Sequence, residues 1–261
     1  DWLDAVSRTG FTMQHTLTMS GGNDKNNYRV SADYRDANGI DLRSGREEYG
    51  ARASIMHTTK SGLFTFTANV APRIIYRDNA DWSVFKDAIE ANPTTPMMDP
   101  ENPARYYNFM GQVVGSNPVE RQKLEKDHAD TKLLDWNATV KLHLLPLLAK
   151  EGKSNHRLTT QLMFADHQYS NNNTWFRPST STIAINNGRE GEASRSYSKE
   201  RQQIMEWLTN YSGSFGQHNV KVMAGYSYQY SNYSGFDAYN KDFPNDGLGA
   251  DNIGSGEYAK E

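Results

Sequence analysis

The 261-residue sequence contains no cysteine. This absence excludes a disulfide scaffold, a thiolate metal site and a cysteine nucleophile. No apolar run approaches the roughly 18 residues of a membrane-spanning helix, because the longest, at 142–149, is interrupted by His143 and Pro146. With 28 basic and 31 acidic residues the net charge is −3, so the charge balance does not predict general nucleic-acid binding.

The sequence also lacks a recognisable catalytic or metal-binding pattern. Its 7 histidines do not occur at metal-ligand spacing. The segment 212–216 has the spacing of a nucleophile elbow, but it lies in an expected strand with no helix after it. The acidic residues of 242–251 do not follow the spacing of an EF-hand. We therefore predict no catalytic residue, no metal site and no cofactor.

What the sequence does contain is a repeated alternation of apolar and polar residues. Such a period of two is typical of strands with one apolar face. One such run alternates Tyr28, Val30, Ala32 and Tyr34 with Arg29, Ser31, Asp33 and Arg35. Seven further runs begin near residues 11, 49, 64, 134, 158, 205 and 220. The pattern predicts an all-β protein with about eight antiparallel strands.

Short and long connections alternate between these expected strands. Short turns are expected at 21–27, 60–62, 149–156 and 216–219, and long segments at 36–47, 77–130, 170–200 and from 232 onward. An up-and-down sheet with its long loops at one rim is typical of bacterial outer-membrane β-barrels. Strands of roughly 9–11 residues, with aromatic residues near both ends, would span a bilayer.

The long segment 77–130 contains the expected helices. Trp82, Phe85, Ala88 and Ile89 fall on one face of a helix, which predicts a helix over 81–89 in this extracellular loop. The run Asn117-Pro118-Val119-Glu120 has the residues of a helix N-terminus, so a second short helix is expected there.

Several short motifs stand out, namely Asp1-Trp2-Leu3-Asp4, Ser20-Gly21-Gly22, the run from Tyr28 to Asp36, Asn92-Pro93-Thr94 and Asn117-Pro118-Val119-Glu120. Together they resemble the SusC/RagA-type TonB-dependent outer-membrane transporters of Bacteroidetes. The resemblance implies a 22-stranded barrel in the outer membrane, an internal plug energised through the TonB complex, and a SusD-like surface lipoprotein that delivers an oligosaccharide or peptide. The chain is then expected to supply about eight strands of one barrel domain, at 1–261, without the plug and N-terminal domains.

Candidate site residues follow from the two faces of this wall. We expect the polar row that includes Arg29, Asp33, Arg52, Asp135 and Lys141 to face the lumen. The opposite row is expected to face lipid and includes Tyr28, Val30, Ala32, Phe64, Phe66, Ala138, Val140, Leu142, Val222 and Ala224. Aromatic rings stack on sugars, so Trp175, Phe176, Tyr106 and Tyr107 are expected in outer loops, where they contact solute or the lipoprotein, or anchor the loops to one another.

Two other functions fit the alternation. A self-closed eight-stranded outer-membrane barrel, acting as an adhesin or an enzyme, would need backbone pairing between the first and eighth strands. A soluble all-β carbohydrate-binding module would need a second sheet over its apolar face. If the chain is instead a sector of a wide barrel wall, we expect an open, curved sheet with two free edges.

Overall fold

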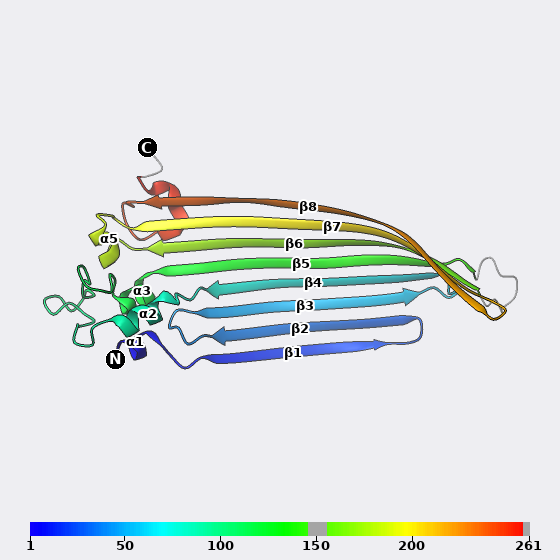
Figure 1. The fold of residues 1–261 in the computed structure, drawn as a ribbon, viewed down its shortest axis with the longest axis horizontal. Helices are drawn as coiled ribbons and strands as arrows, with labels where there is room; N and C mark the ends of the chain where they lie inside the picture. The colour runs from blue at the N-terminus through cyan, green and yellow to red at the C-terminus, as the bar shows by residue number, and fades with distance from the viewer. Residues whose placement is uncertain (146–155, 258–261) are drawn as a thin grey trace.

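The computed structural model describes residues 1–145 and 156–257. Eight strands form one antiparallel sheet in which each strand pairs with its neighbours along the chain (Figure 1). The strands are β1 (Phe11–Gly22), β2 (Asn26–Asn38), β3 (Gly45–Thr58), β4 (Phe64–Asp78), β5 (Lys126–His143), β6 (His156–Arg177), β7 (Glu192–Phe215) and β8 (His218–Lys241). The expected all-β, up-and-down architecture is confirmed.

Short helices gather at one end of the sheet, together with the N-terminus (Figure 1). They are α1 (Trp2–Val6), α2 (Ser83–Glu90), α3 (Pro118–Leu124), α5 (Thr182–Asn186) and the 3-10 helix η1 (Gly249–Ser255). The two predicted helices are α2 and α3. As expected, Asn117 caps α3, since its side chain accepts hydrogen bonds from the backbone N–H groups of Val119 and Glu120 at 3.1 and 3.3 Å. Among the described residues, no helix combines the length and the apolar character that crossing a membrane would require.

The strands are longer and the long connections shorter than the sequence predicts, and β8 continues to Lys241, so the long segment expected from 232 onward begins at 242. Strands are 12 to 24 residues long, because they continue beyond the apolar stretch that the alternation marks. The expected long segment 36–47 is a tight connection at 39–44, and the segment 170–200 shrinks to 178–191 between β6 and β7. The turn predicted at 149–156 lies, up to its last residue, outside the described residues.

The strand register places the apolar residues on one face. Met19 pairs with Val30, which pairs with Ala53, and the same row continues through Val70 to Trp136. Farther along, Ala138, Phe164, Met205 and Tyr228 form the neighbouring apolar row. Because side chains alternate across a strand, the polar residues between these positions all lie on the opposite face.

The apolar band runs obliquely across the sheet. Trp136 pairs with Asp166, which pairs with Gln203, so the row that is apolar in β1 to β5 becomes polar in β6 and β7. Toward the turn end, β7 and β8 remain apolar, as Tyr211 and Val222 show. Strands that tilt relative to a bilayer cross it at successively shifted positions, so an oblique band is what a tilted barrel wall requires.

The two outer strands, β1 and β8, do not pair with each other in the described part of the chain. The sheet is curved and open, as expected for a wall sector (Figure 1). This arrangement argues against the self-closed eight-stranded barrel. It also argues against the soluble module, because Leu17, Val222 and Tyr228 on the apolar face are exposed rather than covered by a second sheet.

The loop end carries its own small core. Trp2 of α1 contacts the buried Phe109 edge-on, with ring centroids 5.4 Å apart, and Val84 and Ala88 of α2 pack in the same cluster. The indole nitrogen of Trp2 donates a hydrogen bond to the carbonyl of Asn92 at 3.2 Å. The helices therefore hold the long loop at 79–125 in a defined position above the strand ends.

Candidate functional site at the polar face and loop end

The five candidate lumen residues share the polar face. Ser31 pairs with Arg52 and Thr65 with Lys141, and the register extends the same face to Arg29, Asp33 and Asp135. The opposite set, from Tyr28 to Ala224, lies on the apolar face. The predicted separation into two faces is therefore confirmed. That the polar face lines a lumen stays a prediction.

Four of these five residues surround a hollow of about 560 Å³ on the polar face, while Lys141 lies apart near the turns. Arg73 also lines the hollow and forms ion pairs with Glu48 at 2.5 Å and with Asp33 at 3.6 Å. Glu48 forms a second ion pair, with Arg46, at 2.7 Å. The hollow thus has charges of both signs, and ion pairs hold Arg73 and Asp33 in place.

A second charged network ties the strand ends together at the loop end. Arg177, the last residue of β6, binds Glu125 and Glu192 at 2.8 Å each. Glu192 also accepts hydrogen bonds from Arg189 and, at 2.9 Å, from the hydroxyl of Tyr239. Because these partners lie directly before β5, at the start of β7 and near the end of β8, the network fixes four strand ends relative to one another.

Trp175 lies beside this network. The sequence predicts it in an outer loop, but it lies in strand β6. Its backbone pairs with Asp127 and Ser194, and Ser194 pairs with Tyr239, so these four residues share a row on the polar face. The guanidinium carbon of Arg177 lies 4.9 Å from the centre of the Trp175 ring. Such a contact holds the ring in one orientation.

Phe176 points to the opposite face, because successive strand side chains alternate. It too lies in β6 rather than in a loop, and it is buried against Ala193, Phe243 and Ala250, with the Phe243 ring centre at 6.4 Å. The structure therefore favours an anchoring role for Phe176. Gly249 adopts a positive φ of 50° close to this ring, which lets the segment after β8 fold back over β6 and β7.

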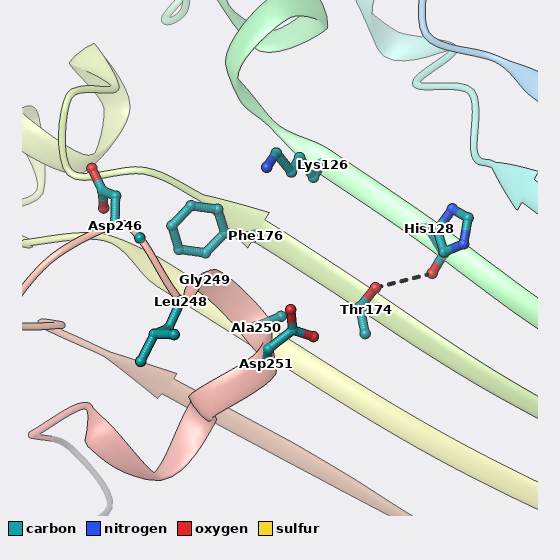
Figure 2. Close-up of a pocket in the computed structure, with 10 residues that line it drawn as sticks. Lys126, His128, Thr174, Phe176, Asp246, Leu248, Gly249, Ala250 and Asp251 are labelled. Atoms are coloured by element: carbon teal, nitrogen blue, oxygen red, sulfur yellow. Dashed lines mark hydrogen bonds between the residues drawn. The ribbon is translucent and has the colours of Figure 1, made fainter.

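A small hollow of about 180 Å³ opens beside Phe176 on the same face (Figure 2). Lys126, His128 and Thr174 line its strand side, and Asp246 and Asp251 lie on the folded-back segment (Figure 2). Within the described residues no group of three or more histidine or acidic side chains is placed to hold a metal ion.

Tyr106 and Tyr107 lie in the long loop as predicted, and both are half-buried against the core of that loop. The Tyr107 ring centre lies 6.1 Å from that of Phe109. Tyr106 lines a hollow of about 400 Å³ that also includes Ile185 of α5. Burial raises the pKa of the Tyr106 hydroxyl, and the negative charge of Glu120 raises it further. These contacts favour a role for Tyr106 and Tyr107 in anchoring the loop.

Sequence reasoning missed the residues that join the loops and strand ends. Glu120 was expected only as a helix-start residue, yet its carboxylate binds Thr182 in the next long loop. No sequence pattern marks Arg177 and Glu192 as a pair, because their pairing depends on where β6 ends and β7 begins. Strands that continue past the apolar band contain no alternation that would reveal those ends.

An open antiparallel sheet with an oblique apolar band, an ion-paired polar face and its loops at one end is the architecture of a partial transmembrane β-barrel. No family model matches the chain. The chain is 24% identical over 241 residues to TonB-dependent receptor P3 of Formosa agariphila, covering 88% of this chain and 22% of that protein. It is 24% identical over 199 residues to TonB-dependent receptor SusC of Bacteroides thetaiotaomicron, covering 66% of this chain and 20% of that protein.

Solved structures show the same fold. The RagAB peptide importer superposes with a TM-score of 0.76 in its closed-closed state and 0.75 in its open-open state, at 17% identity. Each superposition covers 98% of this chain and 28% of the RagAB chain. These similarities confirm the resemblance to SusC/RagA-type proteins. The chain spans about a fifth of the length of its curated relatives, which are named as receptors and not as enzymes.

Proposed function

We propose that residues 1–261 are part of one TonB-dependent receptor β-barrel domain in the bacterial outer membrane. In this proposal they form a sector of the wall and of the extracellular mouth. The oblique apolar band on one face of the sheet is the observation that carries it, because a tilted wall that meets lipid on one side and water on the other needs this pattern.

The proposed activity of the whole protein is active import of a nutrient, not catalysis. Both curated relatives are TonB-dependent receptors. Coupling to the TonB complex would run through a plug region that these residues do not contain, and the polar face with Arg29, Asp33, Arg52, Asp135 and Lys141 would line the lumen around it. Paired charges such as Arg73 with Glu48 keep that surface polar without a large net charge.

The proposed solute is an oligosaccharide or a peptide, delivered by a SusD-like surface lipoprotein. Trp175 presents an aromatic ring on the polar face, which suits stacking on a sugar ring. The adjoining Arg177 and Glu192 offer charges of both signs, which suits the termini and side chains of a peptide. The structural neighbour RagAB is a peptide importer, and this supports the peptide alternative.

The function is tested in the source bacterium by deleting the gene and complementing it with the full-length protein. Growth on a panel of single oligosaccharides and of peptide mixtures identifies the solute, and a strain without TonB tests the coupling. We expect the protein in the outer-membrane fraction, together with loss of growth on one class of solute in both mutants. A protein found in the soluble fraction, or uptake that persists without TonB, would overturn the proposal.

A further inference from the structure

The polar face carries an excess of positive charge on strands β2, β3 and β4. Five successive register rows cross this part of the face, and every row contains an arginine. From the loop end toward the turns, the arginines are Arg46 with Arg77, Arg35, Arg73, Arg52 and Arg29. Throughout these three strands, all of which the structure describes, the face has only two acidic residues, Asp33 and Glu48. On β5 to β8 the same face has acidic and basic residues in nearly equal number, so the excess belongs to this arginine strip.

The two carboxylates are already in use. Glu48 binds Arg46 at 2.7 Å and Arg73 at 2.5 Å, one with each of its oxygens. Asp33 also pairs with Arg73, at 3.6 Å, and its carboxylate occupies the space that a side chain at Gly50 would need. The other arginines of the strip form no ion pair within residues 1–145 and 156–257; they are Arg29, Arg35, Arg52 and Arg77.

The same shortage of acceptors leaves a buried donor unused at the loop end of the strip. Among the described residues, the Nε atom of Arg77 is the one buried side-chain nitrogen or oxygen without a hydrogen-bond partner. Its Nη2 atom donates to the hydroxyl of Thr131 at 3.4 Å. Arg46 lies directly opposite Arg77, and like charges in that position repel each other. The strip is therefore a surface that a negatively charged group would stabilise.

The hollow of about 560 Å³ lies within this strip. Arg29 and Arg52 line it as diagonal neighbours, since Arg52 pairs with Ser31 and Arg29 lies two residues before Ser31 on β2. Diagonal neighbours on one face of a sheet lie roughly 7–8 Å apart, within reach of long side chains. The two guanidinium groups can therefore close on one small anionic group between them.

We propose that Arg29 and Arg52 bind a carboxylate group of the imported solute in this hollow. The inference rests on the proposed function, because it requires the polar face to line the lumen. A guanidinium binds a carboxylate through two parallel N–H donors. The solute is then acidic, either an oligosaccharide that contains uronic acids or a peptide that contains aspartate or glutamate. The other arginines of the strip, about 7 Å apart from row to row, offer the same group successive positions between the mouth and the hollow.

Asp135, on the far side of the hollow, does not take the place of such a ligand. The register puts Ala71 between Arg52 and Asp135, so the two charged residues lie two strand spacings, or about 10 Å, apart. The Asp135 carboxylate lies 2.5 Å from the Nδ1 atom of His167. The carboxylate of a solute at Arg29 and Arg52 would thus lie well away from this negative charge.

The test measures binding of matched acidic and neutral probes to the full-length protein in detergent micelles by isothermal titration calorimetry. One pair is the trimer of galacturonic acid and its methyl ester, and the other is a peptide of alternating glutamate and alanine and its glutamine counterpart. The variant carries Arg29→Gln and Arg52→Gln. The control carries Arg105→Gln and Arg157→Gln, which remove the same charge at two exposed positions outside the strip.

We expect the unchanged protein and the control to prefer the acidic member of at least one pair by about tenfold or more, because hydrogen bonds between charged groups are stronger than neutral ones. The glutamine variant should lose this preference. A variant with Arg29→Lys and Arg52→Lys should keep part of it, since lysine retains the charge but not the planar pair of donors.

The two probe pairs identify the source of the carboxylate. A preference within the sugar pair alone assigns the site to an acidic oligosaccharide, and a preference within the peptide pair alone assigns it to an acidic peptide. No preference for the acidic member of either pair, or an unchanged preference in the glutamine variant, would overturn the proposal. Either result would leave the arginines as partners for carboxylates elsewhere in the full-length protein, such as those of the plug.

Folding and transport are measured separately. Migration of the unheated protein in SDS gels reports whether each variant still forms a barrel, and the lysine variant keeps the test decisive if the glutamine variant does not. TonB-dependent uptake with no preference for acidic solutes would refute the carboxylate site alone. A preference for the acidic probes in binding, without TonB-dependent uptake, would refute the transport function and leave the carboxylate site standing.

Discussion

The carboxylate of Glu120 accepts two hydrogen bonds from Thr182, one from its backbone N–H at 2.6 Å and one from its hydroxyl. Glu120 lies in α3 within the long loop at 79–125, whereas Thr182 begins α5 in the connection between β6 and β7. Both residues are buried. This contact joins the long connection at 79–125 to the connection between β6 and β7, and it holds the first residue of the short helix α5, which no periodic pattern in the sequence predicts.

Removing the Glu120 carboxylate should loosen the two loops. Glu120→Ala leaves the N–H and hydroxyl of Thr182 without their acceptor, which costs about 1–3 kcal/mol for a buried donor. Limited proteolysis of the full-length protein should then cut faster within 79–125 and 178–191. Glu101→Ala, at an exposed position in the same loop, is the control and should leave the cleavage pattern unchanged. Equal cleavage of the two variants would contradict a clamping role.

The contact should also depend on pH. Burial is the largest cause of the raised pKa of Glu120, and the hydrogen bonds from Thr182 oppose it only in part. A carboxyl whose folded pKa lies above its ordinary value of 4.5 favours the folded state most when it is protonated. Loop docking should therefore be strongest below pH 4.5 and weaken as pH rises through the raised value. Amide exchange of Thr182, corrected for its intrinsic pH dependence, measures this, and Glu120→Gln should abolish the trend.

The two faces of the wall make a matched pair of substitutions possible in β5. Ala138 lies on the apolar face between Ala68 and Phe164, and Thr139 lies next to it on the polar face. Ala138→Arg should destabilise the full-length barrel by about 2–4 kcal/mol if the position lies near the bilayer midplane. Thr139→Arg should have little effect. Denaturant unfolding in lipid vesicles compares them, and a larger loss from the Thr139 variant would reverse the assignment of the faces.

The sequence was sufficient to predict the strands of the sheet but not the residues at which they end. Alternation located all eight strands because every second residue must be apolar where the wall meets lipid. The capping residue Asn117 predicted the start of α3 from local sequence alone. Beyond the apolar band, a strand no longer needs an apolar residue at every second position. Asn171, Asn172 and Asn173 continue β6 with polar side chains on both faces, so nothing in the pattern separates strand from loop there. Contacts such as Arg177 with Glu125 join positions 52 residues apart, and single-residue patterns carry no information about such pairs.

Trp175 and Phe176 should respond differently to alanine, although they are adjacent in sequence. Trp175→Ala removes an aromatic ring from the polar face at the mouth and should weaken solute binding without affecting barrel assembly. Phe176→Ala opens a cavity in the small core under the folded-back segment and should cost about 3 kcal/mol locally. Solute affinity and protease sensitivity near 242–257 distinguish the two. If Phe176→Ala lowers solute affinity as much as Trp175→Ala, the anchoring role of Phe176 is wrong.

The ion pair between Asp166 and Arg201 lies on the apolar face, where the band gives way to polar residues. The Asp166 side chain is 1% exposed and that of Arg201 46% exposed, with the two joined at 2.6 Å. Gln203 donates a further hydrogen bond to the same carboxylate at 3.2 Å. The carboxylate is therefore the more sensitive partner, because it would remain buried if the arginine were removed.

We expect Arg201→Leu alone to destabilise the barrel by about 1–3 kcal/mol, because the buried carboxylate of Asp166 loses its charged partner and keeps Gln203 as a donor. The double variant Asp166→Leu, Arg201→Leu should regain most of that stability, since it leaves no charge behind and places two apolar side chains beside Phe164 and Tyr230. Unfolding of the four proteins of this double-mutant cycle in lipid vesicles gives the coupling energy directly. Strictly additive losses, with the double variant the least stable of the four, would show that the pair acts as two independent polar groups in contact with water.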